Sequence, residues 1–131
     1  MSLIRTYSYI KYARLNLDEA SRALGSAQAA RSVEKSLDAA SAMMKAVSAA
    51  LPGVDRDFFR LKQKALERYL ADLTPDADAA ARLSEILYLL TRTDARDLQD
   101  DEDSARALFL EAKKALSILE QIFPAKKHPL Y

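Results

Sequence analysis

Apolar residues recur along most of the chain in alternating steps of three and four, a spacing that keeps them on one face of an α-helix. The pattern covers residues 3–24, 26–51, 75–92 and 103–123, and a broader apolar face covers residues 56–72. The longest unbroken stripe is Ala30, Val33, Leu37, Ala40, Met44, Val47 and Leu51. Because small alanines in these stripes let backbones approach closely, the pattern predicts an all-α fold, an antiparallel up-and-down bundle of four to five helices.

Helix boundaries are predicted from residues that favour caps and turns. Gly25 is expected to end the first helix in a left-handed conformation, and Ser26 to cap the second. Pro52 and Gly53 are expected to stop that second helix. Thr74 is expected to cap the fourth helix, with Pro75 in its first position. We interpret residues 1–124 as one helical-bundle domain and residues 125–131 as a basic C-terminal tail.

The amino-acid composition limits the kinds of catalytic and metal-binding site that the chain can form. Half of the 131 residues are apolar and 30% are charged, as in a globular protein that buries one core. There is no cysteine and only one histidine, His128, which excludes disulfides, cysteine nucleophiles and multi-histidine metal sites within one chain. We therefore expect no metal and no cofactor.

The net charge and the hydropathy pattern indicate where in the cell the protein is expected. The net charge of +1 gives no overall attraction to nucleic acid or acidic membranes. The longest apolar run, residues 86–90, is far too short to cross a bilayer, and no signal-peptide pattern opens the chain. We expect a cytoplasmic protein that does not bind membranes.

A basic ridge is the sharpest charge feature. Arg56, Arg60, Lys64 and Arg68 recur every four residues within the predicted helix 56–72, so they form a slowly winding row. Such a row is typical of phosphate contacts to RNA or a nucleotide. The alternative is a solvated face whose repulsion neighbouring acidic residues relieve.

Two other clusters have both a functional and a structural interpretation. Residues 93–103 form a strongly acidic connector with Arg96 as its only base; they contact a cation or basic partner, or simply cap the last helix. Tyr7, Tyr9 and Tyr12 form either a surface on which bases stack or the rim of the bundle. His128, beside two lysines in the tail, is interpreted as a non-catalytic residue.

Three stretches together resemble the HEPN superfamily of small all-α domains. Residues 9–20 resemble its first helix, residues 30–39 its second with an Ala-x-x-x-Glu-Lys core, and residues 104–122 its last, rich in alanine and leucine. The resemblance spans most of the chain in order and length. It implies a helical bundle in which dimers are common, so a homodimer is expected here too.

HEPN nucleases are similar to one another in an Arg-x(4–6)-His signature late in the domain. The resemblance places Arg92 and Arg96 near that position, but no histidine follows either at the required spacing. It therefore implies a non-enzymatic interaction module that binds a protein partner, such as a nucleotidyltransferase or toxin–antitoxin partner, or RNA. The alternatives are a degenerate HEPN ribonuclease using Arg92 and Arg96, and a small helical subunit of an RNA-guided or other ribonucleoprotein complex.

Overall fold

The structure is a computed structural model that describes residues 3–51, 53, 59–98 and 101–124. Within these residues every regular element is helical, as predicted. In chain order they are α1 (Ile4–Gly25), α2 (Ala29–Ala50), α3 (Gln63–Ala71), α4 (Ala77–Thr91), the 3₁₀ helix η2 (Ala95–Asp97) and α5 (Glu102–Ile122).

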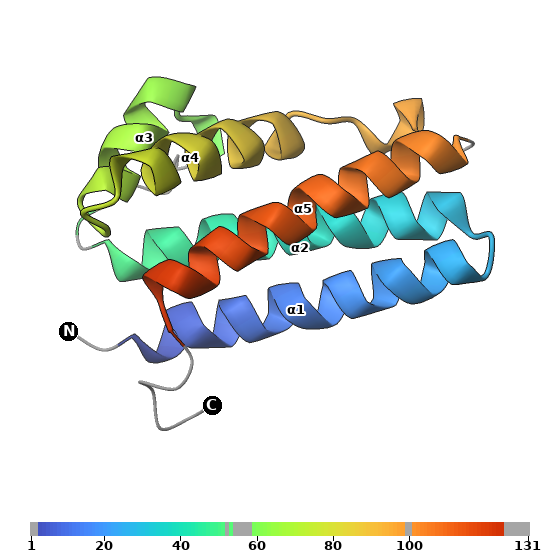
Figure 1. Cartoon of the computed structure of the whole chain (residues 1–131), viewed down its shortest axis with the longest axis horizontal. Helices are drawn as coiled ribbons and strands as arrows, with labels where there is room; N and C mark the ends of the chain where they lie inside the picture. The colour runs from blue at the N-terminus through green and yellow to red at the C-terminus, as the bar shows by residue number, and fades with distance from the viewer. Residues whose placement is uncertain (1–2, 52, 54–58, 99–100, 125–131) are drawn as a thin grey trace.

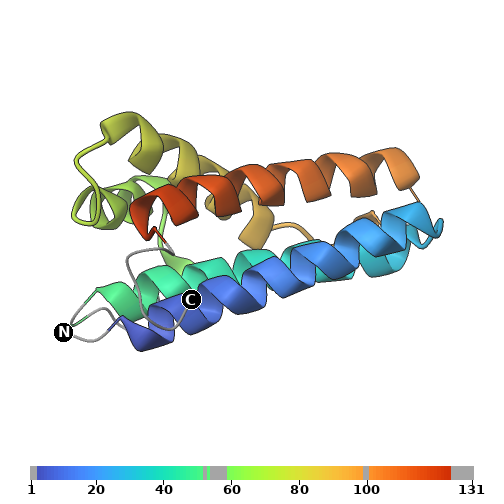
Figure 2. The ribbon, with the colours of Figure 1, turned by 60° about the horizontal axis from the view of Figure 1, so that its bottom comes forward.

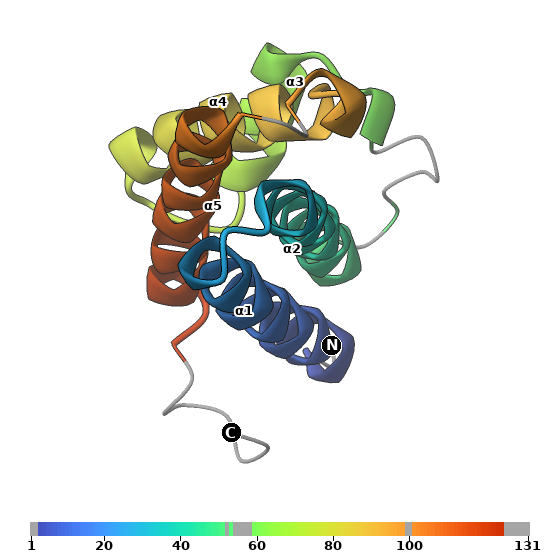
Figure 3. The same ribbon diagram turned by 90° about the vertical axis from the view of Figure 1, so that its right-hand side faces the viewer.

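The four long helices run alternately up and down, so the predicted bundle is confirmed (Figure 1). Turned by 60°, the molecule has two layers, α1 with α2 in one and α5 with α4 in the other (Figure 2). Viewed from its end, α5 lies against α1, α2 and α4, while the short helix α3 packs on α4 (Figure 3). None of the helices in the described residues is long and apolar enough to span a membrane.

One apolar cluster joins α1, α2, α3, α4 and α5. Most of the predicted stripe positions are buried in it, among them Ile10, Val33, Leu83 and Leu119, each no more than 1% exposed. Two members of the predicted second stripe differ. Ala30 is exposed and Leu37 is only half-buried, because the buried face of the first turns of α2 is centred on Ser32, Val33 and Ser36.

Helices α1 and α2 approach each other closely through small side chains. Ala13, Ala20, Ala39 and Ala46 are fully buried. The Thr6 hydroxyl, itself buried, donates a hydrogen bond across the pair to the carbonyl oxygen of Ala46 at 3.0 Å. Small stripe residues therefore bring the two backbones within reach of a short side chain, as the alanine content indicates.

The turn between α1 and α2 differs from the predicted one. Gly25 is the last residue of α1, and the left-handed residue is Ala27, with φ of 56°. The amides of Ala27 and Gln28 donate to the carbonyls of Leu24 and Ala23, which forms a Schellman-type cap two residues beyond the glycine. Consequently Ser26 belongs to the end of α1, and Gln28 rather than Ser26 precedes α2.

Later boundaries are closer to expectation. Helix α2 ends at Ala50, just ahead of Gly53, which has φ of 76°. Asp76, rather than Thr74, caps α4 by accepting from the amide of Ala79 at 3.1 Å; the Thr74 hydroxyl instead accepts from the amide of Asp76. Asp101 caps α5 by accepting from two backbone amides, which confirms that the acidic connector ends in a cap.

The third helix is shorter than predicted. It begins at Gln63 rather than near residue 56, because Lys62 has an extended backbone with φ of −70° and ψ of 157°. Leu61, which packs against the core from outside the helix, precedes the buried Leu66 by five residues and so breaks the helical period.

Two buried hydroxyl groups lack partners among the described residues, those of Ser32 and Ser36 on α2. An unsatisfied buried hydroxyl costs about 1–3 kcal/mol. We expect Ser32→Ala and Ser36→Ala each to raise the free energy of unfolding by about 1 kcal/mol in urea denaturation. Ser8→Ala on the exposed face of α1 is the control; a destabilising effect of both buried substitutions would show that these hydroxyls have partners in solution.

Candidate functional site

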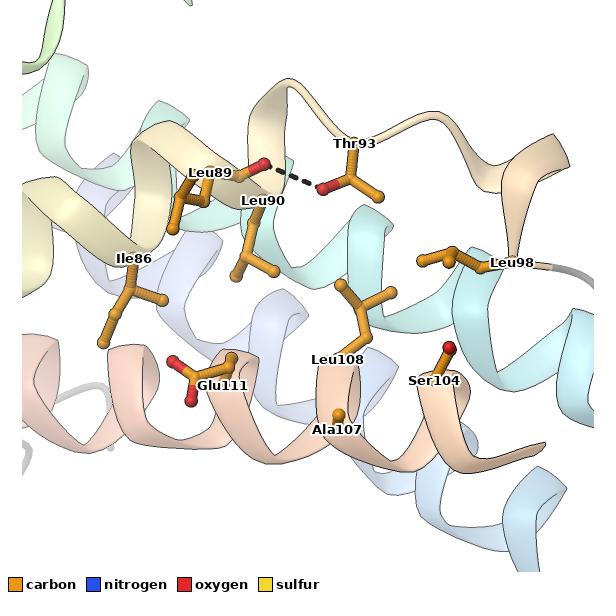
Figure 4. A pocket seen from close by; sticks show the side chains of 9 residues that line it. All are labelled: Ile86, Leu89, Leu90, Thr93, Leu98, Ser104, Ala107, Leu108 and Glu111. Carbon is orange, nitrogen blue, oxygen red and sulfur yellow. Dashed lines mark hydrogen bonds between the residues drawn. The ribbon is translucent and has the colours of Figure 1, made fainter. Parts of the chain in front are cut away.

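An open apolar groove lies between α4 and α5, beneath the connector that joins them (Figure 4). Its volume is about 330 Å³. Figure 4 shows α4 and the connector above the groove and α5 below it. The lining residues are Ile86, Leu89, Leu90, Thr93, Leu98, Ser104, Ala107, Leu108 and Glu111. We call this feature the α4–α5 groove.

The groove arises because α4 carries more apolar residues than its core stripe requires. Leu83, Leu87 and Leu90 are buried, whereas Leu89, on the same helix, is 60% exposed. Beyond the end of α4, Leu98 comes back from the connector to close one end of the groove. Apolar side chains therefore remain at the surface after the core is complete.

A second depression continues the groove along α5. It shares Ala107 and Glu111 with the groove and extends past Leu110 to Lys113, Lys114 and Ser117. Leu110 is 49% exposed. The exposed leucines of α4 and α5 therefore lie along one partly apolar surface.

The polar side chains that line the groove already form hydrogen bonds within the chain. The Thr93 hydroxyl donates to the carbonyl of Leu89 at 2.8 Å, as Figure 4 shows, and the Ser104 hydroxyl donates to the Asp101 carboxylate at 2.6 Å. Glu111 accepts from the Lys114 ammonium at 3.1 Å. What these three side chains still offer to a ligand is acceptor lone pairs.

The groove has ends of opposite charge. Asp97, Asp101 and Asp103 stand next to the lining residues Leu98 and Ser104, and we call them the acidic rim. Hydrogen bonds from the Ser104 hydroxyl, and from the Ser104 and Asp103 amides, lower the pKa of Asp101, so this carboxylate is ionised at neutral pH. The other end carries Lys113 and Lys114, of which Lys114 is paired with Glu111.

The predicted basic ridge is not one helical row. Arg56 lies outside the described residues, and Arg60 precedes the first residue of α3. Only Lys64 and Arg68 share the helix, where both are exposed one turn apart. The extended residue Lys62 interrupts the helical period, so Arg60 does not share a helical row with Lys64 and Arg68, and the part of Arg56 in a basic surface stays a prediction.

Arg92 makes structural contacts. Its guanidinium lies 3.8 Å from the centre of the Tyr88 ring and donates to the carbonyl of Leu61 at 2.9 Å. It thereby ties the end of α4 to the segment that precedes α3.

Arg96 pairs with a close neighbour in the connector. It donates to both carboxylate oxygens of Asp94, at 3.2 and 2.9 Å, which lowers the pKa of Asp94 and raises that of Arg96. Neither Arg92 nor Arg96 lines the α4–α5 groove.

The contact of Arg92 with Leu61 is expected to stabilise the fold. We expect Arg92→Ala to lower the free energy of unfolding by about 0.5–1.5 kcal/mol, because a charge-assisted hydrogen bond and a cation–π contact are lost. Arg96→Ala is the matched control, since its partner Asp94 lies only two residues away in an exposed turn. Equal urea midpoints for the two variants would contradict a tethering role for Arg92.

The three tyrosines of α1 have different surroundings. Tyr7 is buried, packs edge-on against Phe123 with ring centres 6.2 Å apart, and donates its hydroxyl to the carbonyl of Pro124 at 3.3 Å. Tyr9 and Tyr12 line a small recess between α1 and α2 beside Asp38, where burial raises the pKa of the Asp38 carboxyl. Tyr7 thus has a packing role, while Tyr12 is 57% exposed.

The groove is a site that was not predicted from the sequence, although the sequence contains one signal for it. Leu89 and Leu110 are large apolar residues outside the core stripes of their helices, and unpaired apolar positions of this kind indicate a second contact surface. His128 and the rest of the tail lie outside the described residues.

Among the described residues, no group of three histidine, cysteine, aspartate or glutamate side chains is arranged to hold a metal ion. No protein-family model matches the chain, and neither a curated protein nor a solved structure is significantly similar to it.

Proposed function

We propose that this chain is a non-enzymatic helical interaction module, of HEPN-like type, that acts by binding a partner protein in the α4–α5 groove. The observation that carries the proposal is the exposure of Leu89 beside an open apolar groove of about 330 Å³. Exposed apolar surface of this kind is costly in water unless a partner covers it, and grooves between antiparallel helices are common docking sites for protein segments.

The contacts of the family-motif arginines support a non-catalytic role. In HEPN-type cleavage an arginine must be free to bind phosphate, whereas Arg92 here contacts the Tyr88 ring and the Leu61 carbonyl. Arg96 is paired with Asp94 in a connector whose other charges repel phosphate. These contacts favour an interaction module over a degenerate ribonuclease.

Site-specific photo-crosslinking in the native cell tests the proposal. A photoreactive residue is placed at Leu89, and a matched variant carries it at Leu15, another exposed leucine, on α1. We expect a discrete crosslinked protein from position 89 that is absent from position 15 and is lost when Leu110→Glu is added. An identical set of products from both positions, or none from position 89, would contradict protein binding in the groove.

RNA binding is the second candidate, and the exposed pair Lys64 and Arg68 on α3 is what favours it. A surface of only two cations is small for binding RNA phosphates. We therefore expect the double substitution Lys64→Glu and Arg68→Glu to leave the retention of labelled RNA unchanged between about 50 and 200 mM salt. A salt-dependent affinity that falls in this double variant would instead favour a ribonucleoprotein subunit. Cleavage of the RNA by the purified protein would favour the degenerate ribonuclease.

A further inference from the structure

We infer that the occupant of the α4–α5 groove is an amphipathic helix of a partner protein, with basic residues at the end that lies over the acidic rim. The inference rests on the proposed protein-binding function and adds the chemistry of the partner. It is carried by three properties of the groove: its length, the kind of polar group that it offers, and the charge of its two ends.

The length of the groove suits consecutive anchors of a helix. Its lining runs along α5 from Ser104 to Glu111, which is about 10 Å, or two turns, at 1.5 Å per residue. Apolar side chains at i, i+3 or i+4, and i+7 of a docked helix span that distance. The floor that they would contact consists of the side chains of Ile86, Leu90, Leu98 and Leu108.

The polar groups of the groove select for donors. The hydroxyl protons of Thr93 and Ser104 are already donated to Leu89 and Asp101, and Glu111 is a carboxylate. A docked segment therefore finds acceptors at these three side chains, which ammonium and guanidinium groups satisfy and carboxylates do not.

Charge sets the direction of the docked helix. Within the described residues, Asp97, Asp101 and Asp103 have no ion pair, whereas Asp94 and Glu102 are paired with Arg96 and Arg106. The acidic rim therefore carries net negative charge. At the opposite end Lys114 is paired with Glu111, and Lys113 is the lysine without an ion pair among the described residues. Lysine or arginine at one end of the partner helix is attracted to the rim and repelled by Lys113.

The first experiment selects ligands from a library of random helical peptides displayed on phage, using the full chain as bait. Phage that also bind the Leu89→Glu variant are removed. We expect the enriched peptides to carry apolar residues at helical spacing and an excess of lysine and arginine toward one end. Enrichment of acidic peptides, or no enrichment dependent on Leu89, would overturn the inference.

The second experiment measures the affinity of one enriched peptide for charge variants by fluorescence anisotropy. Asp97→Asn with Asp103→Asn is expected to weaken binding by about twofold to fivefold per charge, an effect that high salt removes. Lys113→Gln with Lys114→Gln is the matched control and is expected to keep or strengthen binding. Equal losses in the two double variants, with circular dichroism unchanged, would contradict the assigned direction.

Other outcomes separate this inference from the proposed function. A wild-type dimer in sedimentation that Leu89→Glu dissociates would identify a second copy of the chain as the occupant and overturn the inference. Crosslinking from position 89 together with acidic selected peptides would leave the protein-binding function standing and remove only the basic partner. Absence of both crosslinks and Leu89-dependent peptides would overturn both.

Discussion

Replacing Leu119 by alanine is expected to lower the free energy of unfolding by about 2–5 kcal/mol. Leu119 is completely buried in α5, the helix that lies against α1, α2 and α4, so truncation leaves a cavity where the two layers meet. Chemical denaturation followed by circular dichroism measures the loss. For a domain of this size, it is a large part of the total stability.

Leu15→Ala is the matched control for this prediction. Leu15 is 52% exposed on α1, so its truncation removes few core contacts and is expected to change stability by less than about 0.5 kcal/mol. Losses of equal size in the two variants would mean that α5 is not central to the core.

Enlarging Ala46 to leucine is the second substitution with a large expected effect. Ala46 is completely buried in α2, and its carbonyl accepts the Thr6 hydroxyl of α1, so the two helices are close together at this level. Three additional carbon atoms must either separate the helices or adopt a strained rotamer, and we expect a loss of about 1–3 kcal/mol in the free energy of unfolding. Thermal and urea denaturation both report it.

Ala30→Leu tests whether the size of the new side chain alone matters. Ala30 lies on the same helix but is exposed, so the added carbon atoms extend into solvent and are expected to leave stability nearly unchanged. A stable Ala46→Leu variant with an unchanged unfolding midpoint would show that α1 and α2 are less tightly packed than the structure indicates.

The two faces of α5 explain how a core helix also supplies part of the candidate site. Its inward stripe, which includes Ala105, Leu108, Ala112 and Leu119, is buried. Leu110 and Ala107 lie outside that stripe and remain at the surface. Ala107 lines the groove together with Leu89 of α4, and Leu110 lines the depression that continues it. A helix can thus complete the fold with one face and present an apolar surface with another.

Helix caps could be predicted only in part from neighbouring residues in the sequence. Asp101 caps α5 as expected, because an aspartate before a helix can satisfy amides that are only two or three residues away. Gly25 does not act as expected: the Schellman-type cap places its left-handed residue at Ala27. The exact residue at which a helix ends depends on the direction in which the chain continues into the next helix. That direction is set by how the two helices pack together.

The sequence alone determined the all-helical class, the order of the long helices and most of their buried faces, because the three-and-four spacing acts within each helix independently of its neighbours. Only the tertiary structure decided where α3 begins, what Arg92 contacts and which leucines stay exposed. Arg92 and Leu61 are 31 residues apart, and the α4–α5 groove combines residues from two helices and their connector. Such features depend on which faces meet after folding, and the period of a single helix carries no information about that.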